Sequence, residues 1–497
     1  MSIEYFIDKK PFTYMFLLPN TYNKKIKKVL KNKCKILQKK ENIINTGYYN
    51  NELYEEFLDD YSYEYIKINN ISKYHSDSFK NISENTTIII VNYLTREIPN
   101  DLPNNIECLI ICSSSCKLPT KYPENLKYLY LRCYNQDVIN LPNKLKYLHV
   151  DGGYNKNVND LPKSLKFLYV SNGFYGSLEK INLKFLKIHN NYKDIINFLP
   201  KDLNKLEIST NNSVKIIHDK ITHLYFMSNV PIYDLPDSIT HLTFGYLFDQ
   251  CVDNLPKNLT HLKFGERFCQ PVDNLPESLT HIIFGGFFSR PVDKLPKNLK
   301  YIKFGEWFGD RIKRDLSKLP PNLTHLIFDK QTKSGCELIN LPKTLSYLDF
   351  GRGFHGGKIY YLNNLKTLIL GPWSGIPSDM PENLEKLIIS NSLIKKINTL
   401  PKNLTYLAFA DCSEFNQPLN NLPVNLTYLK LGENFNQPLN NLPVSLIHLK
   451  LGEFFNNITI NIPTTVEKIK LYKNQIELFK KLPFNCVLEI LEKKKDY

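Results

Sequence analysis

The apolar positions of this chain recur with a period close to twenty residues. Leu-Pro pairs open most periods, and the clearest unit runs from Leu255 to Asn274, after which Leu275 opens the next one. Counted from its leucine, the apolar residues of this unit occupy positions 1, 5, 8, 10, 14 and 18. Self-similarity at such a period is the signature of a stacked repeat protein. The pattern predicts one long array of about nineteen turns between residues 102 and 474.

Each unit contains the alternation of a short β-strand. Leu262 and Phe264 flank the polar Lys263, which is the period of two that a strand with one buried face requires. Glycine follows the strand, as at Gly265, and we expect a positive φ to be the reason. Pro256 lacks the N–H that a central strand needs, so it belongs to the returning segment. The prediction is a repeat solenoid, a right-handed parallel β coil with strands of about three to five residues and short returning segments.

Aromatic residues at position 14 form a second periodic series. A single turn cannot bury its apolar groups, but stacked turns bury them against each other. We therefore predict that this series fills the core and does not line a ligand channel. The series comprises Tyr154, Phe174, Phe248, Phe268, Phe288, Phe308, Phe354, Phe415, Phe435 and Phe455.

Composition narrows the classes of function. The net charge is +15, but only seven of the 64 basic residues are arginine, the residue that dominates base and phosphate recognition. The ten cysteines include no C-x-x-C pair, and no recognised catalytic spacing occurs. We therefore predict a protein that is not an enzyme and has no cofactor and no metal site. The apolar run near Met15 is too short for a signal peptide or a membrane span, which predicts a cytoplasmic protein.

Two segments carry a more specific motif. Phe415-Asn416-Gln417-Pro418 and Phe435-Asn436-Gln437-Pro438 each precede Leu-Asn-Asn-Leu-Pro. This motif resembles the FNIP-repeat family of social amoebae and of the giant viruses that infect amoebae, and the unit is similar to short bacterial leucine-rich repeats. The resemblance implies a leucine-rich-repeat-like coil, a role in protein–protein interaction and, for a viral protein, a place in the host cytoplasm. Many members begin with an F-box and recruit substrates to a ubiquitin ligase, but the first hundred residues here lack that pattern.

The ends of the array need caps, because an open coil leaves an unpaired strand and an exposed core. We assign residues 83–101 to an N-terminal cap and residues 475–497 to a helical or irregular C-terminal cap and tail. Residues 1–82 form an N-terminal region of uncertain fold. Within it, the lysine-rich segment 24–40 is either a surface helix or a basic amphipathic helix that meets a membrane surface or an acidic partner.

Outward positions 7 and 9 of the strands are the candidate binding site. Rings recur at position 7, so they line up from turn to turn, and position 9 adds hydroxyl and ammonium donors. Aromatic residues with adjacent donors dominate interface hot spots. We predict a protein-binding surface here, named the binding stripe, which consists of His223, Tyr225, His241, His261, Lys263, His281, Tyr301, Lys303, His325 and Tyr347.

Other interpretations of these residues remain open. The rings could serve only to stabilise the sheet, and the Lys and Tyr rows could contact a nucleic acid or another acidic surface. A metal site is disfavoured because carboxylates and cysteines are missing from the same positions. Since unperturbed histidine titrates near pH 6.5, we expect an acidic partner to bind more tightly as the pH falls through that region.

Overall fold

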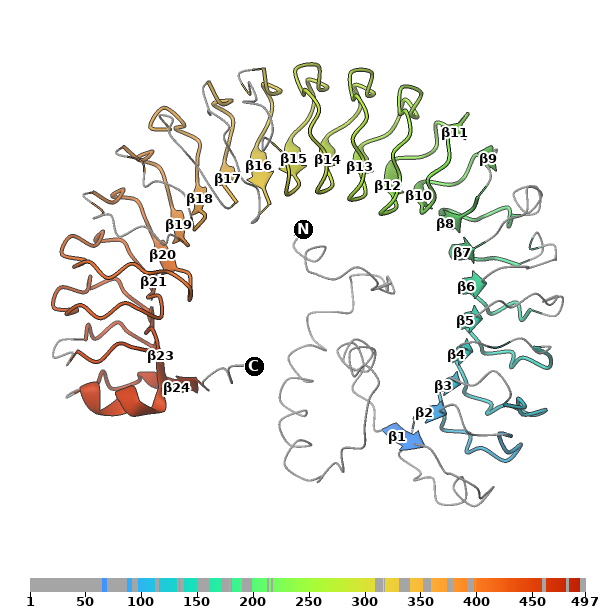
Figure 1. The fold of residues 1–497 in the computed structure, drawn as a ribbon. Coiled ribbons are helices and arrows are strands. Elements are labelled where there is room, and N and C mark those ends of the chain that lie inside the picture. The colour runs from blue at the N-terminus through green and yellow to red at the C-terminus, as the bar shows by residue number, and fades with distance from the viewer. Residues whose placement is uncertain are drawn as a thin grey trace. The chain divides into compact units, whose positions relative to one another are not determined.

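The computed structural model describes residues 65–68 and, with gaps, residues 87–491; the longer gaps are 151–160, 171–177, 190–198, 309–315, 330–339, 352–358 and 391–396. Within it the chain forms two compact units, Met1–Arg132 and Cys133–Tyr497. Both units are built from short strands that follow one another along the chain (Figure 1). The basic segment 24–40 lies outside the described residues.

The described residues of the first unit contain four strands, each parallel to the next. They are β1 (Tyr65–Ile68), β2 (Ile88–Val91), β3 (Cys108–Ile111) and β4 (Tyr128–Leu131). The predicted N-terminal cap at 83–101 contains β2, which pairs with β1 on one side and with β3 on the other. The sheet of this unit therefore begins at β1, before the segment that was predicted to cap its N-terminal end.

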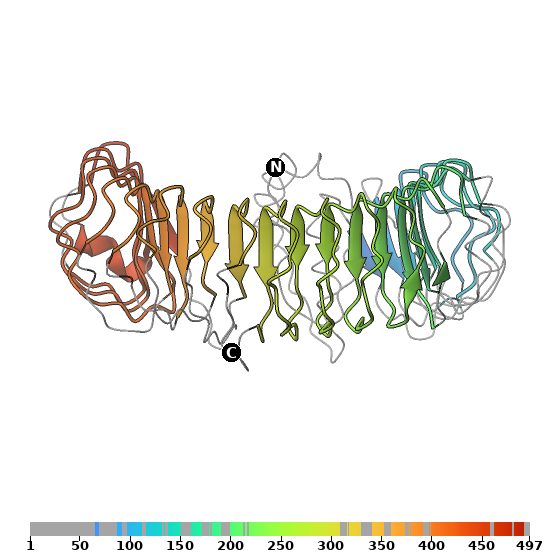
Figure 2. The ribbon, with the colours of Figure 1, turned by 90° about the horizontal axis from the view of Figure 1, so that it is seen from above.

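The second unit continues the pattern with one strand in almost every period. In Figure 1 these strands line the inner side of its curve, and Figure 2 shows them standing side by side. They are β5 (Tyr147–Val150), β6 (Phe167–Val170), β7 (Phe185–His189), β8 (Lys205–Ser209), β10 (His223–Phe226), β12 (His241–Phe244), β13 (His261–Lys263), β14 (His281–Ile283), β15 (Tyr301–Phe304), β16 (His325–Phe328), β17 (Tyr347–Asp349), β18 (Thr367–Leu370), β19 (Lys386–Ile389), β20 (Tyr406–Phe409), β21 (Tyr428–Lys430), β22 (His448–Lys450), β23 (Lys468–Tyr472) and β24 (Val487–Leu491). A separate parallel pair is formed by β9 (Val214–Lys215) and β11 (Ile232–Tyr233).

The register of these strands confirms the parallel coil. His241, Leu242 and Thr243 of β12 pair with His261, Leu262 and Lys263 of β13, so each repeat position lies beside its equivalent in the next turn. The burial alternates as the sequence predicts, with Leu262 only 2 % exposed between two half-buried neighbours. Strand lengths of three to five residues in this sheet are confirmed as well.

Two stacked series of phenylalanines fill the core. Phe264 lies face to face with Phe268 of its own turn at a ring-centroid distance of 3.7 Å, and it stacks on Phe284 of the next turn at 5.7 Å. Position 14 continues this order, because Phe268 and Phe288 are parallel to within 6°. All of the described position-14 phenylalanines are at most 2 % exposed. The core prediction is therefore confirmed for them, while Tyr154, Phe174 and Phe354 lie outside the described residues.

The glycine that follows several of the strands allows the backbones of successive turns to approach closely. A Cβ on Gly265 would lie 1.8 Å from the carbonyl oxygen of Gly245 in the preceding turn, so the backbones approach too closely for a side chain. A positive φ is found at Gly351 (+57°), which is the position-11 glycine of its own turn. The predicted positive φ is thus wrong for Gly265, where close packing of the turns is the cause.

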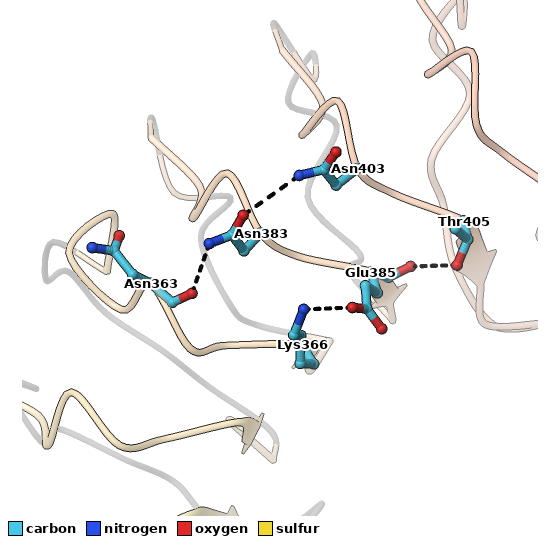
Figure 3. A network of polar contacts seen from close by, with 6 residues as sticks. All are labelled: Asn363, Lys366, Asn383, Glu385, Asn403 and Thr405. Carbon is cyan, nitrogen blue, oxygen red and sulfur yellow. Dashed lines mark hydrogen bonds and ion pairs between the residues drawn. The ribbon is translucent and has the colours of Figure 1, made fainter.

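Polar side chains also link each turn to the one before it (Figure 3). Asn383 donates from Nδ2 to the backbone oxygen of Asn363 at 3.0 Å, and Thr405 donates to the backbone oxygen of Glu385 at 3.2 Å. The Lys366 ammonium forms an ion pair with Glu385 at 2.5 Å. The Asn383 amide thus bonds a carbonyl in the segment before the strand, whereas the Thr405 hydroxyl adds to the backbone N–H bonds that the Glu385 carbonyl already accepts.

The C-terminal cap differs in part from its prediction. The 3₁₀ helix η3 (Lys473–Leu478) follows β23, and the chain then returns to form β24, which pairs with β23 along its whole length. The side chain of Gln475 is completely buried, and its amide donates to the backbone oxygens of Gly452 at 2.7 Å and Phe455 at 3.0 Å. A helical element is therefore present, but the segment also adds one more strand to the sheet.

The glycine geometry gives a matched pair of substitutions. We expect Gly265→Ala to destabilise the protein by about 1–3 kcal/mol, because its Cβ would meet backbone that cannot move aside. Gly286→Ala is the control, since its Cβ would meet only the flexible end of Glu266, and a cost of about 0.5 kcal/mol is expected. Urea unfolding of both variants measures the difference. Equal costs would contradict the close-approach explanation.

Candidate binding face

The histidines of the binding stripe form an ordered stack on the outward side of the sheet. We name the run His223, His241, His261 and His281 the histidine ladder. Its successive ring centroids are 4.2, 4.2 and 4.3 Å apart, with planes parallel to within 9°. The in-register pairing of β10 and β12–β14 imposes this order, because it places position 7 of each turn beside position 7 of the next.

The stack continues with wider spacing beyond the histidine ladder. Tyr301 lies 5.6 Å from His281 and 6.0 Å from His325, and His325 lies 5.4 Å from Tyr347. Six successive ring contacts therefore connect seven turns of the coil. The structure brings all the predicted position-7 residues of the stripe into one row.

A threonine precedes each histidine of this row and holds its ring. The Nδ1 atoms of His223, His241, His261, His281 and His325 lie 2.8 to 3.0 Å from the hydroxyl oxygen of the residue before them. Each of these hydroxyls also lies 2.9 to 3.2 Å from a backbone carbonyl oxygen of the preceding turn. The rings are thus fixed from the side as well as by stacking.

Burial lowers the basicity of these imidazoles. Loss of solvation lowers the pKa of His223, His241 and His281 to about 4, with smaller contributions from neighbouring histidines and lysines. The same loss of solvation lowers the pKa of His261 and of His325. His223, His241 and His281 are therefore neutral in the pH range near 6.5. These shifts argue against the expected strengthening of binding to an acidic partner in that range, because His223, His241 and His281 gain no charge there.

The position-9 residues contribute less free charge than the sequence suggested. Lys303 lies 3.7 Å from the Asp329 carboxylate, which neutralises it. The ammonium of Lys263 is half-buried, and loss of solvation together with Lys303 lowers its pKa. Tyr225 is half-buried as well, and burial followed by Glu207 raises its pKa. Tyr301 is only 8 % exposed, so it offers a partner little area.

Two features of this face were missed from the sequence. The threonine partners are one, although the dipeptide Thr-His recurs at Thr222, Thr240, Thr260, Thr280 and Thr324 and would have revealed them. The second is a row at position 13, just after the strands, where Phe287 is 48 % exposed and stacks on Trp307 at 6.2 Å. The Arg267 guanidinium lies 5.7 Å from the same phenylalanine ring. This row could have been found in the sequence, because Arg267, Phe287 and Trp307 are spaced by twenty residues.

Metal chemistry finds no support in this geometry. Within the described ranges, no group of three or more His, Cys, Asp or Glu side chains is placed to hold a metal ion. The nearly parallel imidazole planes also direct neighbouring lone pairs alongside each other, whereas ligands of one ion must converge on it. No described helix has the length and apolar character that a membrane crossing requires.

Comparison with known proteins agrees with this architecture. The model of the FNIP repeat matches residues 226–267, 252–287, 268–307 and 415–454. Among solved structures, CroV588, a circular LRR protein, is 26% identical, with 82% of this chain and 79% of that chain covered and a TM-score of 0.54. The chain is therefore a leucine-rich-repeat type of solenoid that carries FNIP repeats.

Other solved structures are more distant. YopM from Yersinia enterocolitica is 19% identical, with 82% of this chain and 87% of that chain covered and a TM-score of 0.32. A leucine-rich repeat protein from Bacteroides ovatus is 13% identical, with 82% and 84% covered and a TM-score of 0.19. A search among curated proteins finds no match.

The lowered histidine pKa values predict a loss of stability in acid. The unfolded chain binds protons at these residues below pH 6.5, whereas the folded chain resists them until about pH 4, so stability falls as the pH drops through this window. We expect the triple variant His241→Tyr, His261→Tyr and His281→Tyr to lose less thermal stability than the wild type between these pH values. Tyrosine occupies the same position at Tyr301, so the stack should persist. Identical pH profiles of melting temperature would contradict the assignment.

Proposed function

We propose that this chain is a non-enzymatic scaffold that binds a partner protein on the exposed face of its sheet, along the binding stripe from His223 to Tyr347. The observation that carries the proposal is the unbroken row of ring contacts over seven turns, of which all but the Tyr301–His325 contact are stacked. Stacking and threonine bonds fix the rings before any partner arrives, so little rotamer entropy is lost on binding. Solenoids of the leucine-rich-repeat type generally bind proteins through extended surfaces of this kind.

The alternative of nucleic-acid binding has less support from the same residues. Phosphate recognition depends on cations that are free to pair with the backbone. Here Lys303 is neutralised by Asp329, and Lys187 lies 2.7 Å from Glu207 on β8. The rings also stack on each other and so expose edges, whereas base stacking needs exposed ring faces. The role of an F-box substrate adaptor rests only on the family resemblance.

A triple substitution tests the proposal. The variant His241→Ser, His261→Ser and His281→Ser removes three rings of the histidine ladder and leaves the buried leucines and phenylalanines in place. We expect proteins that the wild type captures from an amoebal lysate at neutral pH to be retained at least tenfold less, the loss that about 1.4 kcal/mol of binding free energy produces. Quantitative mass spectrometry of the captured fraction measures the ratio.

The matched control lies on the turns of His261, His281 and Tyr301 but away from the sheet. Lys257→Ser, Glu277→Ser and Lys297→Ser change exposed side chains of the turn before each strand. This control should capture the same proteins as the wild type. Circular dichroism must show that both variants keep their β-structure. If the histidine variant folds and captures its partners with unchanged yield, the binding stripe serves only the sheet.

A further inference from the structure

The hydrogen bonds of the Thr-His pairs favour one position for the proton of each imidazole. A threonine hydroxyl has one proton, yet the Thr260 hydroxyl oxygen lies 3.0 Å from the backbone oxygen of Thr240 and 2.9 Å from Nδ1 of His261. The carbonyl oxygen can only accept, and it also accepts the backbone N–H groups of Thr260 and His261. Both contacts of the hydroxyl are hydrogen bonds only when the hydroxyl donates to this carbonyl. In that arrangement Nδ1 carries the imidazole proton and donates to the hydroxyl oxygen. The same geometry recurs for His223, His241, His281 and His325.

The second nitrogen of each neutral ring is then an unprotonated acceptor. In the described part of the chain, Nε2 of the histidine ladder forms no hydrogen bond; the polar contact of each ring is through Nδ1. The rings are half-buried, so their free edge remains accessible. Because the planes are parallel to within 9°, the Nε2 lone pairs form a regular row.

A shallow hollow next to the ladder, at the start of strands β14 to β16, has the same polarity. Its hydroxyl groups lie within hydrogen-bond distance of backbone carbonyls of the preceding turn, as does one amide donor of each asparagine, so these donors are already engaged. These side chains are Ser278, Thr280, Asn298, Asn322, Thr324 and Thr344. The Lys300 ammonium lines the same hollow and disfavours a cationic ligand.

We infer that the threonines act as positioning residues, which hold the histidine ladder in the Nδ1–H tautomer so that it presents a row of hydrogen-bond acceptors. The ladder then binds an uncharged polypeptide segment that is rich in amide and hydroxyl donors. The inference rests on the proposed function and names the chemistry of its partner. A carboxylate would place its oxygens against the Nε2 lone pairs with no proton between them. An acidic segment therefore loses its hydration at this surface without gaining hydrogen bonds.

The tautomer is tested by nitrogen-15 NMR of histidine-labelled protein at neutral pH, because the two ring nitrogens shift in opposite directions with protonation. We expect His241, His261 and His281 to carry the proton on Nδ1. His448 is an internal control, since it is exposed and Ile447 precedes it in place of threonine; it should resemble free histidine, in which Nε2–H predominates. The variant Thr240→Val, Thr260→Val and Thr280→Val should shift its ladder toward Nε2–H. Protonated Nε2 on the wild-type ladder would overturn the inference, whether or not the variant folds.

Partner chemistry is tested with two immobilised synthetic peptides of equal length that alternate Thr-Asn and Thr-Glu. We expect wild-type protein to be retained by the Asn peptide and not by the Glu peptide. The variant His241→Lys, His261→Lys and His281→Lys should reverse this order; lysine is compatible with the position, because Lys205, Lys386 and Lys468 occupy it in other turns. Preference of the wild type for the Glu peptide, or retention by neither peptide, overturns the inferred chemistry. The proposed function is tested separately: it fails if the variant His241→Ser, His261→Ser and His281→Ser captures the same amount of partner protein from the lysate as the wild type.

Discussion

In-register pairing of successive turns is the constraint on which the rest of this structure depends. A turn of about twenty residues cannot bury its own apolar groups, so it is stable only against a neighbour with the same shape. Parallel pairing in register then places every residue beside its equivalent, as Leu262 beside Leu242 and Phe268 beside Phe248. The phenylalanine stacks and the close approach at Gly265 both follow from that placement.

The same constraint organises the polar groups. A carbonyl just before the strand recurs once per turn, and the side chain that donates to it recurs with it, as for Asn383 and Thr405 in Figure 3. Where the repetition ends, a different device is needed. Gln475 folds into the coil after β23 and supplies hydrogen bonds to carbonyls of the turn that contains Gly452 and Phe455. A buried polar group is stable there because each of its bonds is made.

Repetition also changes the chemistry of a residue type. One histidine on a surface titrates near pH 6.5, but a stacked row shields its members from water and lowers their pKa. The same row, held by threonines, presents acceptors in place of the cations that its composition suggested. The electrostatic character of the candidate site thus arises from the array, and the family resemblance, which supplied the fold, gave no information about it.

The sequence by itself determined the period, the positions of the strands and the side chains that face the core, because these depend on local alternation and on spacing between equivalent residues. It also placed the rings of the binding stripe in one row. Only the tertiary structure decided what each outward group does there. Lys303 is neutralised by Asp329, and Tyr301 is covered by its neighbours. Strand β1 of the first unit precedes the predicted N-terminal cap, and β24 of the second unit forms within the predicted C-terminal cap. Such properties depend on distances between groups on different turns, and a periodic pattern specifies which turns are neighbours but not how closely their atoms approach.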